Sequence, residues 1–275
     1  MKLEQSVARH YAHDSLERVI CGALEAAGKD LGQLLPADLA PVDEFHIGGR
    51  QATVDFADGL AAGPGLHLLD IGAGLGGASR YFAHERGCRV TGIDLTEDYV
   101  HAAAALAKLV GLESRVSYRQ GSALSLPFAP GSFDGAYMLH VGMNIQDKVK
   151  LFAEARRVVK TGGIFGIYDV MREHGEGELS FPLPWASGPE ASFVETPSTY
   201  RQLLEAAGFV VEKERSRSAF AIEFFHEMRA RAVQGGGPPP LGIHLLMGPS
   251  AAQKIANLTG ALERGLIAPV EIFCR

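Results

Sequence analysis

Apolar runs of strand length alternate with helical patterns through the middle of the chain. The apolar runs predict strands at residues 66–71, 88–94, 116–120, 133–139 and 163–169. The segments between them predict helices at residues 77–86, 97–110 and 147–159. Because strands and helices alternate on this scale, we expect an α/β fold with parallel strands and helices on both faces of the sheet.

The alternation ends after Asp169. Residues 171–197 are rich in Gly, Pro and Glu and include the single tryptophan, Trp185, so we expect a lid insertion there. Further along, the patterns predict helices at 196–207, 219–233 and 250–263, strands at 209–212 and 266–273, and a loop at 234–240.

The chain before the first predicted strand has a different pattern of apolar and polar residues. Residues 1–60 carry helical patterns, and the Gly- and Pro-rich stretch 61–65 separates them from the alternating region. We therefore divide the chain into an N-terminal helical cap, residues 1–60, and a core, residues 61–275, that contains the lid insertion.

Composition narrows the classes of function. The chain has 275 residues with 47% hydrophobic and 21% charged residues, which is ordinary for a globular protein. A net charge of −6 argues against nucleic-acid binding, which favours a basic face. We see no signal peptide, no membrane span and no cysteine spacing that suits a metal, and the three separated cysteines favour a reducing compartment. We therefore expect a cytoplasmic protein.

The most informative stretch is LLDIGAGLGGASR, residues 68–80. Gly72, Gly74 and Gly77 fit the dinucleotide pattern GxGxxG, whereas Gly72, Gly74 and Gly76 fit the looser pattern of an S-adenosylmethionine site. Asp70 helps to separate the two ligands, because a carboxylate so close to the glycine turn would repel a pyrophosphate but suits a cationic sulfonium.

A second acid follows at the end of the next strand. Asp94 lies 24 residues after Asp70, where a carboxylate accepts hydrogen bonds from both ribose hydroxyls, and Leu95 is expected to lie against the adenine. Nicotinamide cofactors and S-adenosylmethionine both use such an acid. Asp94 therefore indicates an adenosyl ligand without choosing between them.

Four segments together resemble the motifs of class I S-adenosylmethionine-dependent methyltransferases. They are HLLDIGAGLGGASRYFA, VTGIDLT, YRQGSALSLPFAPGSFDGAYMLHV and EARRVVKTGGIFGIYD, in the order found in that family. The resemblance implies a Rossmann-like sheet of seven strands in the order 3-2-1-4-5-7-6 with strand 7 antiparallel. It also implies S-adenosylmethionine as cofactor, bound by Asp70, Gly72, Gly74, Gly76, Asp94 and Leu95.

One position departs from the pattern of that family. Many of its members have Gly-Asp-Ala after the third strand, and the acid accepts a hydrogen bond from the adenine amino group. Here the run is Gly121-Ser122-Ala123. Ser122 is still expected to accept that bond, beside Ala123, but less strongly than a carboxylate. Either the affinity for the cofactor is lower, or another group supplies the contact.

Residues 43–60 resemble the segment before the first motif in sarcosine/dimethylglycine and phosphoethanolamine methyltransferases. That resemblance implies that His46 and Gly49 line the methionine end of the cofactor, although an ordinary helix that starts at a glycine explains the pattern too. In the phosphoethanolamine enzymes an N-terminal tyrosine closes over the sulfonium and pairs with a histidine in a Leu-His motif. Tyr11 and Leu139-His140 stand at those positions here, so Leu139 is expected at the cofactor and His140 as the base.

These features favour transfer of a methyl group from S-adenosylmethionine to nitrogen or oxygen, or to carbon, of a small molecule such as an amine, a phenol or a natural product. Phe181, Pro184, Trp185 and Phe193 of the lid offer an apolar or cation–π surface for that acceptor. Two alternatives stay open: a protein that binds S-adenosylmethionine without turnover, and an NAD-dependent oxidoreductase. The oligomeric state is also open, with a homodimer as one option.

Overall fold

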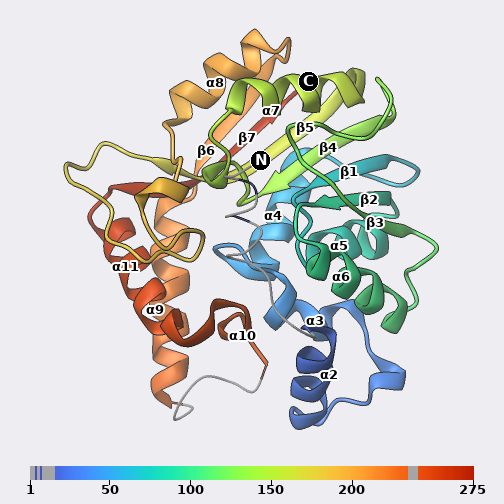
Figure 1. The fold of residues 1–275 in the computed structure, drawn as a ribbon, viewed down its shortest axis with the longest axis vertical. Helices are drawn as coiled ribbons and strands as arrows, with labels where there is room; N and C mark the ends of the chain where they lie inside the picture. The colour runs from blue at the N-terminus through green and yellow to red at the C-terminus, as the bar shows by residue number, and fades with distance from the viewer. Residues whose placement is uncertain (1–3, 5–6, 8–15, 235–240) are drawn as a thin grey trace.

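Seven strands form one sheet in the order β3-β2-β1-β4-β5-β7-β6 (Figure 1). The strands are β1 (His67–Ile71), β2 (Arg89–Asp94), β3 (Val116–Gln120), β4 (Phe133–Leu139), β5 (Val159–Arg172), β6 (Val211–Ser216) and β7 (Ile267–Cys274). The neighbouring pairs β3–β2, β2–β1, β1–β4 and β4–β5 are parallel. Strand β7 is antiparallel to both of its neighbours, β5 and β6. This confirms the strand order and the antiparallel strand 7 that the sequence predicts. The computed structural model describes residues 4, 7, 16–234 and 241–275.

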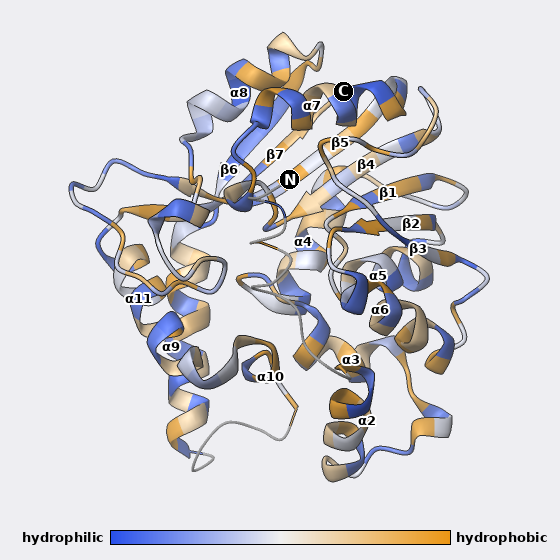
Figure 2. Ribbon diagram, viewed as in Figure 1, coloured by the Kyte–Doolittle hydropathy of each residue, from blue (hydrophilic) through white to orange (hydrophobic). Residues whose placement is uncertain are grey.

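Helices cover both faces of the sheet. One face packs against α4 (Gly49–Leu60), α5 (Gly77–Glu85) and α6 (Glu97–Leu109), and the other packs against α7 (Lys148–Val158) and α8 (Pro197–Ala206). Figure 2 shows hydrophobic residues along the central strands and a mixture of hydrophobic and hydrophilic residues along the helices. The apolar positions face the sheet because burial removes their surface from water.

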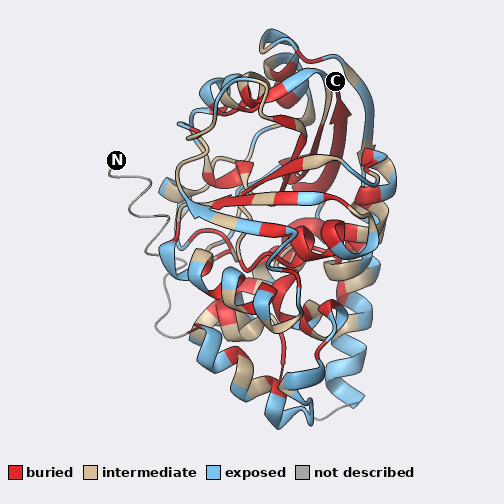
Figure 3. Ribbon diagram, turned by 90° about the vertical axis from the view of Figure 1, so that its right-hand side faces the viewer, coloured by how far each residue is buried: buried red, intermediate tan, exposed pale blue. Residues whose placement is uncertain are grey.

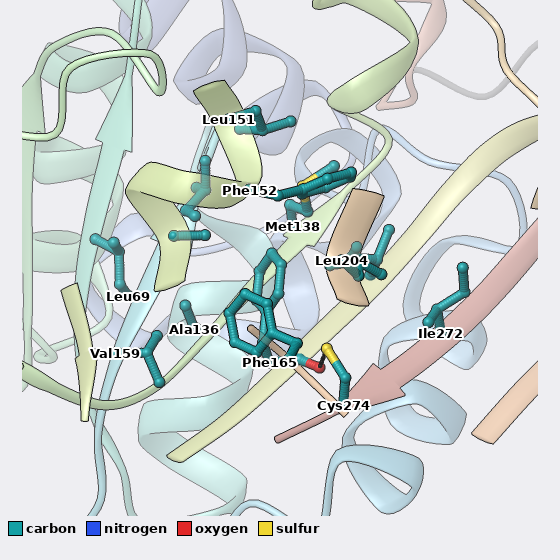
Figure 4. Close-up of a cluster of buried hydrophobic side chains, with 14 of the residues drawn as sticks. Leu69, Ala136, Met138, Leu151, Phe152, Val159, Phe165, Leu204, Ile272 and Cys274 are labelled. Carbon is teal, nitrogen blue, oxygen red and sulfur yellow. Dashed lines mark hydrogen bonds between the residues drawn. The ribbon is translucent and has the colours of Figure 1, made fainter. Parts of the chain in front are cut away.

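The α7–α8 face holds the larger apolar core. Figure 4 shows Leu69, Ala136 and Phe165 from three neighbouring strands meeting Phe152 of α7 and Leu204 of α8, and all five are fully buried. Figure 3 shows the strand that ends at the C-terminus buried along its length, and this strand is β7. Both faces of the sheet are therefore covered by helices, and the ends of its strands are the places where a functional site can form.

Helix α4 is one of the covering helices of the sheet. Its Phe56 lies against Phe273 of β7 with ring centroids 5.2 Å apart, and a Cβ on Gly166 of β5 would lie only 2.6 Å from the Phe56 ring. The rest of the described N-terminal part consists of α2 (Leu16–Ala26), the short helix η1 (Leu31–Gln33) and α3 (Pro36–Asp43), which pack together with α6.

A second group of helices follows β6. It consists of α9 (Ser218–Gln234), α10 (His244–Met247), η4 (Gly248–Ser250) and α11 (Ala251–Glu263). In Figure 1, α9 and α11 lie across the molecule from α2 and α3, whereas α10 reaches over to pack with α3. The group leaves the sheet after β6 and returns at β7, where Ser216 pairs with Val270 and Arg217 N donates to Pro269 O over 2.8 Å. No described helix is long and apolar enough to cross a membrane.

The structure corrects three predicted elements. β6 begins at Val211 rather than at residue 209, because the Phe209 ring stacks on Phe165, 5.1 Å away between centroids, before the strand starts. β5 is longer than residues 163–169 and runs to Arg172, so the segment that follows it, which contains the short helix η3 (Pro189–Ala191), starts later than residue 171. Another short helix, η2 (Gly142–Asn144), lies between β4 and α7. Thr96, a residue type that often caps helices and that the sequence places directly before the predicted helix at 97–110, makes no capping bond from its side chain to α6. The predicted loop 234–240 lies almost wholly outside the described residues.

Candidate functional site

A cavity of about 380 Å³ lies at the carboxyl ends of β1, β2 and β4. This is where open parallel sheets bind their ligands, and the volume lies within the range of small-molecule sites. Most of the residues predicted for the site line it: His46, Asp70, Gly72, Gly74, Asp94, Leu95, Ser122, Ala123, Leu139 and His140. Tyr11, the remaining catalytic candidate, lies outside the described residues.

The glycine turn after β1 shapes one wall of this cavity. Gly74 has a φ of +54°, and a Cβ built on it would find no heavy atom within 4 Å. Its backbone N–H donates to Asp94 Oδ2 over 2.8 Å, and Thr96 N donates to Asp94 Oδ1 over 2.9 Å. Only glycine adopts this positive φ without strain and also leaves the space in front of the backbone open to a ligand.

Two predicted glycines lie outside the wall. Gly76 precedes α5 with a φ of +78°, and its missing side chain makes room for the Tyr118 hydroxyl, which would lie 2.2 Å from a Cβ. Gly49 starts α4 and offers its carbonyl to His46 Nε2 over 3.1 Å. These glycines position other residues and do not line the cavity themselves.

Asp70 is buried at the end of β1. Its Oδ2 accepts hydrogen bonds from Ser79 Oγ over 2.6 Å and from the Tyr137 hydroxyl over 3.1 Å. Burial raises the pKa of this carboxyl to about 7, against the lowering effect of those two bonds. A positive charge in the cavity would favour its ionised form.

A chain of three side chains leads from Glu44 to His46. Thr53 Oγ donates to Glu44 Oε2 over 2.7 Å and lies 3.0 Å from His46 Nε2. Because Gly49 O can only accept, we assign the imidazole hydrogen to His46 Nε2, which leaves Nδ1 as an acceptor. Burial lowers the pKa of His46 to about 4, so the ring is neutral at pH 7.

Glu44 itself lines the cavity with an unsatisfied atom. Its Oε1 is buried and has no hydrogen-bond partner among the described residues. Burial raises the pKa of Glu44 to about 8, helped by the charge of neighbouring Asp43, which itself pairs with the buried Arg80. An orphaned carboxyl oxygen at a cavity wall is a site for a cationic group or an N–H donor.

His140 follows β4 in a strained backbone conformation. Its φ is +56°, a region that residues other than glycine seldom adopt, and its N–H donates to Tyr168 O over 2.7 Å. The ring packs on Tyr168, with centroids 5.0 Å apart. Nε2 is buried without a partner in the described part of the chain. Burial and the neighbouring His46 hold the pKa of His140 well below its usual value, so the ring is neutral.

The far half of the cavity is apolar, and its main elements were not predicted as part of a site. Its walls come from four separate parts of the chain: Met143, Pro184 and Trp185, Phe224 and Phe225 of α9, and Ile243, Leu246, Met247, Ile255 and Leu258 around α10 and α11. We call these ten residues the apolar chamber. The apolar positions of α9 and α11 are visible in the sequence, but nothing in their spacing says what they face.

The predicted lid contributes part of this chamber. Trp185 is held by its indole N–H, which donates to Ser192 Oγ over 3.0 Å, and by its carbonyl, which accepts from Asn144 Nδ2 over 2.8 Å. Phe181 packs beside the chamber, and Phe193 N donates to Met143 O over 2.7 Å. Pro184 and Trp185 therefore line the cavity, and Phe181 and Phe193 do not.

The charges around the cavity have one sign. The ionisable side chains among its described lining residues, apart from the two histidines and Tyr99, are all acidic: Glu4, Asp43, Glu44, Asp70, Asp94 and Asp147. No lysine or arginine is among those lining residues. The nearby Lys148 is buried and donates to the carbonyls of Ile145 and Phe193 instead. The cavity therefore suits cationic and neutral groups better than phosphates or carboxylates.

Residues 69–167 match a family described as "Methyltransferase domain". The chain is 34% identical over 113 residues to the sterol 24-C-methyltransferase ERG6B of Gibberella zeae, which covers 41% of this chain and 30% of that protein. It is 30% identical over 149 residues to the sarcosine/dimethylglycine N-methyltransferase of Halorhodospira halochloris, covering 54% and 52%.

Solved structures share the fold. The phosphoethanolamine N-methyltransferase 2 of Haemonchus contortus, in complex with S-adenosyl-L-methionine, superposes with a TM-score of 0.75 at 20% identity, covering all of this chain and 60% of that one. The chain spans about a third of the length of the first curated relatives that it matches.

Proposed function

This chain carries a methyltransferase domain of the S-adenosylmethionine-dependent class, and on that premise we propose that it methylates an apolar small molecule without phosphate, at oxygen or nitrogen. The observation that carries the proposal is the division of the cavity into an acidic half at the sheet and an apolar chamber without a cationic side chain. The relatives are named as sterol, sarcosine/dimethylglycine and phosphoethanolamine methyltransferases, so their names alone do not give one acceptor class for this chain.

The acidic half fits S-adenosylmethionine. Gly74 leaves the wall open, Asp94 can accept from the ribose hydroxyls, and His46 Nδ1 and Glu44 Oε1 offer acceptors to the ammonium group. When bound, the cofactor supplies a methyl group on a sulfonium, which is a good leaving group. The acids of this half favour a cation over the neutral product, so they hold the substrate form more tightly.

His140 is the proposed base. It lines the cavity where the sheet meets the apolar chamber, and its neutral Nε2 has no partner among the described residues. A hydroxyl of the acceptor gives its proton to that nitrogen while its oxygen bonds to the methyl carbon. An ammonium gives up its proton first, and the lone pair left on its nitrogen then forms the bond to the methyl carbon. The carbon–sulfur bond breaks with its electron pair on sulfur, and S-adenosylhomocysteine is released. Positioning and exclusion of water supply most of the rate enhancement.

The apolar chamber sets the acceptor class. Buried sites commonly recognise a phosphate or diphosphate through arginine or lysine donors, and none of the ten chamber residues is an arginine or lysine. Phe224, Phe225 and Trp185 instead present aromatic surface to an apolar or cationic body. The sterol relative is consistent with an apolar acceptor, and the phosphoethanolamine relative marks the alternative.

The test is a transfer assay with labelled S-adenosylmethionine and a matched panel of acceptors: a sterol, an alkylphenol, a long-chain amine, sarcosine and phosphoethanolamine. We expect label on apolar acceptors and none on phosphoethanolamine. Label on phosphoethanolamine alone would contradict the acceptor class. Binding of S-adenosylhomocysteine without label on any acceptor would favour a cofactor-binding protein without turnover, and binding of NADH alone would favour an oxidoreductase.

A further inference from the structure

Arg217 lies between β6 and α9, at the point where the second group of helices leaves the sheet. Its side chain is buried and bonds to two acids from different elements. Nη1 donates to Glu271 Oε1 of β7 over 3.1 Å, and Nη2 donates to Asp55 Oδ2 of α4 over 2.5 Å. Arg217 therefore fixes the start of α9 to the sheet and to α4 at the same time.

The Arg217 guanidinium also stacks on an aromatic ring of α9. Its Cζ lies 4.1 Å from the centroid of the Phe220 ring, within the range of a cation–π contact. That ring occupies the space beside Gly48, where a Cβ would lie only 2.3 Å from Phe220 Cε1. Gly48 has a φ of +90°, so the backbone and the ring both require glycine there. Phe220 therefore lies directly against the backbone of residues 46–48, the segment that precedes α4.

The same segment is held by β5. The Tyr168 hydroxyl donates to Ile47 O over 2.9 Å, and the Tyr168 ring meets the ring of His46 edge-on, with centroids 6.1 Å apart. His46 and Ile47 both line the cavity. Residues 46–48 are thus fixed by one contact from the sheet and by another from α9.

Helix α9 belongs to the acceptor half of the cavity as well. Phe224 and Phe225 are residues of the apolar chamber. Phe220 and Phe224 lie four positions apart and therefore on the same side of the helix. One helix thus touches the segment that carries His46 and also lines the chamber, and the bonds of Arg217 determine where that helix begins.

We propose that Arg217 and Phe220 are positioning residues for the cofactor: they hold residues 46–48 where His46 contacts the amino-acid end of S-adenosylmethionine. This inference rests on the proposed function for the placement of that end of the cofactor at His46, and it does not depend on the acceptor. The helix that lines the acceptor chamber then also sets the affinity for the cofactor.

The test is calorimetric binding of two ligands, S-adenosylhomocysteine and 5′-methylthioadenosine. The second ligand keeps the adenosine and the sulfur but has a methyl group in place of the amino-acid chain. We expect Arg217→Met to weaken binding of S-adenosylhomocysteine roughly 5-fold to 30-fold and to leave binding of 5′-methylthioadenosine within about twofold. A general loss of structure would weaken both ligands, so the preference for S-adenosylhomocysteine reports on the amino-acid end alone.

Arg215→Met is the matched control. Arg215 also pairs with Glu271, over 2.6 Å, but its side chain is 40% exposed, and it shares neither Asp55 nor Phe220 with Arg217 in the described structure. This variant should also lower the melting temperature, yet bind both ligands as the wild type does. Phe220→Leu replaces Arg217→Met if the latter does not fold, with a smaller change expected in the same direction.

An unchanged preference for S-adenosylhomocysteine in the folded test variant would overturn this inference and leave the proposed function standing. An equal loss of preference in Arg215→Met would overturn it too, because that side chain does not reach Phe220. Wild-type protein that binds the two ligands equally would contradict both the inference and the placement of the amino-acid end at His46. Wild-type protein that prefers S-adenosylhomocysteine but labels no acceptor would contradict the proposed function alone.

Discussion

The ring of His140 meets the ring of His46 edge-on, with centroids 5.9 Å apart and planes at 67°. Both rings line the cavity, and burial lowers the pKa of both. They differ in their partners. His46 Nε2 lies within hydrogen-bond distance of Gly49 O and Thr53 Oγ, whereas His140 Nε2 has no partner in the described part of the chain. The pair therefore divides into a ring whose Nε2 has partners and a ring whose Nε2 has none among the described residues, and the second is the ring that we propose as the base.

Replacement of His140 should separate catalysis from cofactor binding. Asparagine is the replacement of choice, because it tolerates a positive φ better than most residues do. We expect His140→Asn to lower kcat roughly 100-fold to 10,000-fold with an acceptor that must lose a proton, and to leave the affinity for S-adenosylhomocysteine within a few-fold. Single-turnover rates and calorimetry measure the two quantities. His84→Asn, on the exposed side of α5, is the control, and an unchanged kcat in His140→Asn would exclude the base role.

Binding of S-adenosylmethionine should release protons. The pKa of Glu44 is raised to about 8 and that of Asp70 to about 7, so near pH 7 Glu44 is mostly protonated and Asp70 is about half protonated in the free protein. A sulfonium favours their ionised forms, so affinity should rise between pH 6 and pH 9, and more steeply for S-adenosylmethionine than for neutral S-adenosylhomocysteine. Calorimetry in two buffers of different ionisation enthalpy counts the protons, and Glu44→Gln should reduce their number.

The same shifts predict how the free protein responds to pH. A carboxyl whose pKa is higher in the folded state than in the unfolded state stabilises the fold at low pH, and this contribution is lost as pH rises through the folded-state value. For Glu44 and Asp70 that window runs from about pH 4 to about pH 8. The melting temperature without ligand should therefore fall across the upper part of that window, and S-adenosylmethionine should reverse the fall. A ligand-free melting temperature that rises from pH 6 to pH 8 would contradict these assignments.

Gly74 and Gly131 offer a matched pair of glycines. Both have a positive φ, +54° and +63°, and a Cβ on either would meet nothing closer than 4.0 Å. Alanine at each position should cost about 1–2 kcal/mol of stability through backbone strain. Only Gly74→Ala places a methyl group in the cavity, so only this variant should bind S-adenosylhomocysteine at least tenfold more weakly, about 1.4 kcal/mol. Equal affinities for the two variants would place the cofactor elsewhere.

Tyr200 supports Asp169 beneath the cavity floor. Its hydroxyl donates to Asp169 Oδ2 over 2.6 Å, both residues are fully buried, and burial raises the pKa of Asp169 to about 6. Tyr200→Phe should cost about 1–3 kcal/mol in the free energy of unfolding, and more at pH 8 than at pH 5, because the ionised carboxylate depends more on a donor. Denaturant midpoints at the two pH values measure this. Tyr81→Phe, whose hydroxyl accepts from the partly exposed Arg86, should show no such pH difference.

The strands and the cofactor motifs could be predicted from the sequence because both are local patterns. The runs at β1 and β4 are apolar, and Asp70, Gly72 and Gly74 stand in one short turn. The order of the strands came from the resemblance to a family, since pairing joins residues far apart. β6 was misplaced because VEKERS is a charged edge strand without apolar alternation.

Apart from Pro184 and Trp185, the apolar chamber could not be predicted from the sequence, for the same reason. Trp185, Phe225 and Leu258 meet in one cluster although long stretches of chain separate them, and Glu4 reaches Ser122 across most of the first half of the chain. No local spacing encodes such contacts. The roles of Tyr11, of the cap over residues 1–60 and of the lid stay predictions, as do a cytoplasmic location and a homodimer.

The connection between β6 and β7 has a consequence for how such a protein can change its substrate. Because Ser216 pairs with Val270, the chain leaves the sheet and re-enters it at adjacent points. The segment between β6 and β7, which contains α9 and α11, is therefore an insertion whose two ends are fixed in the sheet. The entropy cost of closing such an inserted segment depends only weakly on its length. Under the proposed function, acceptor specificity can therefore be exchanged by replacing this inserted segment while the glycine turn after β1, which lines the same cavity, stays as it is.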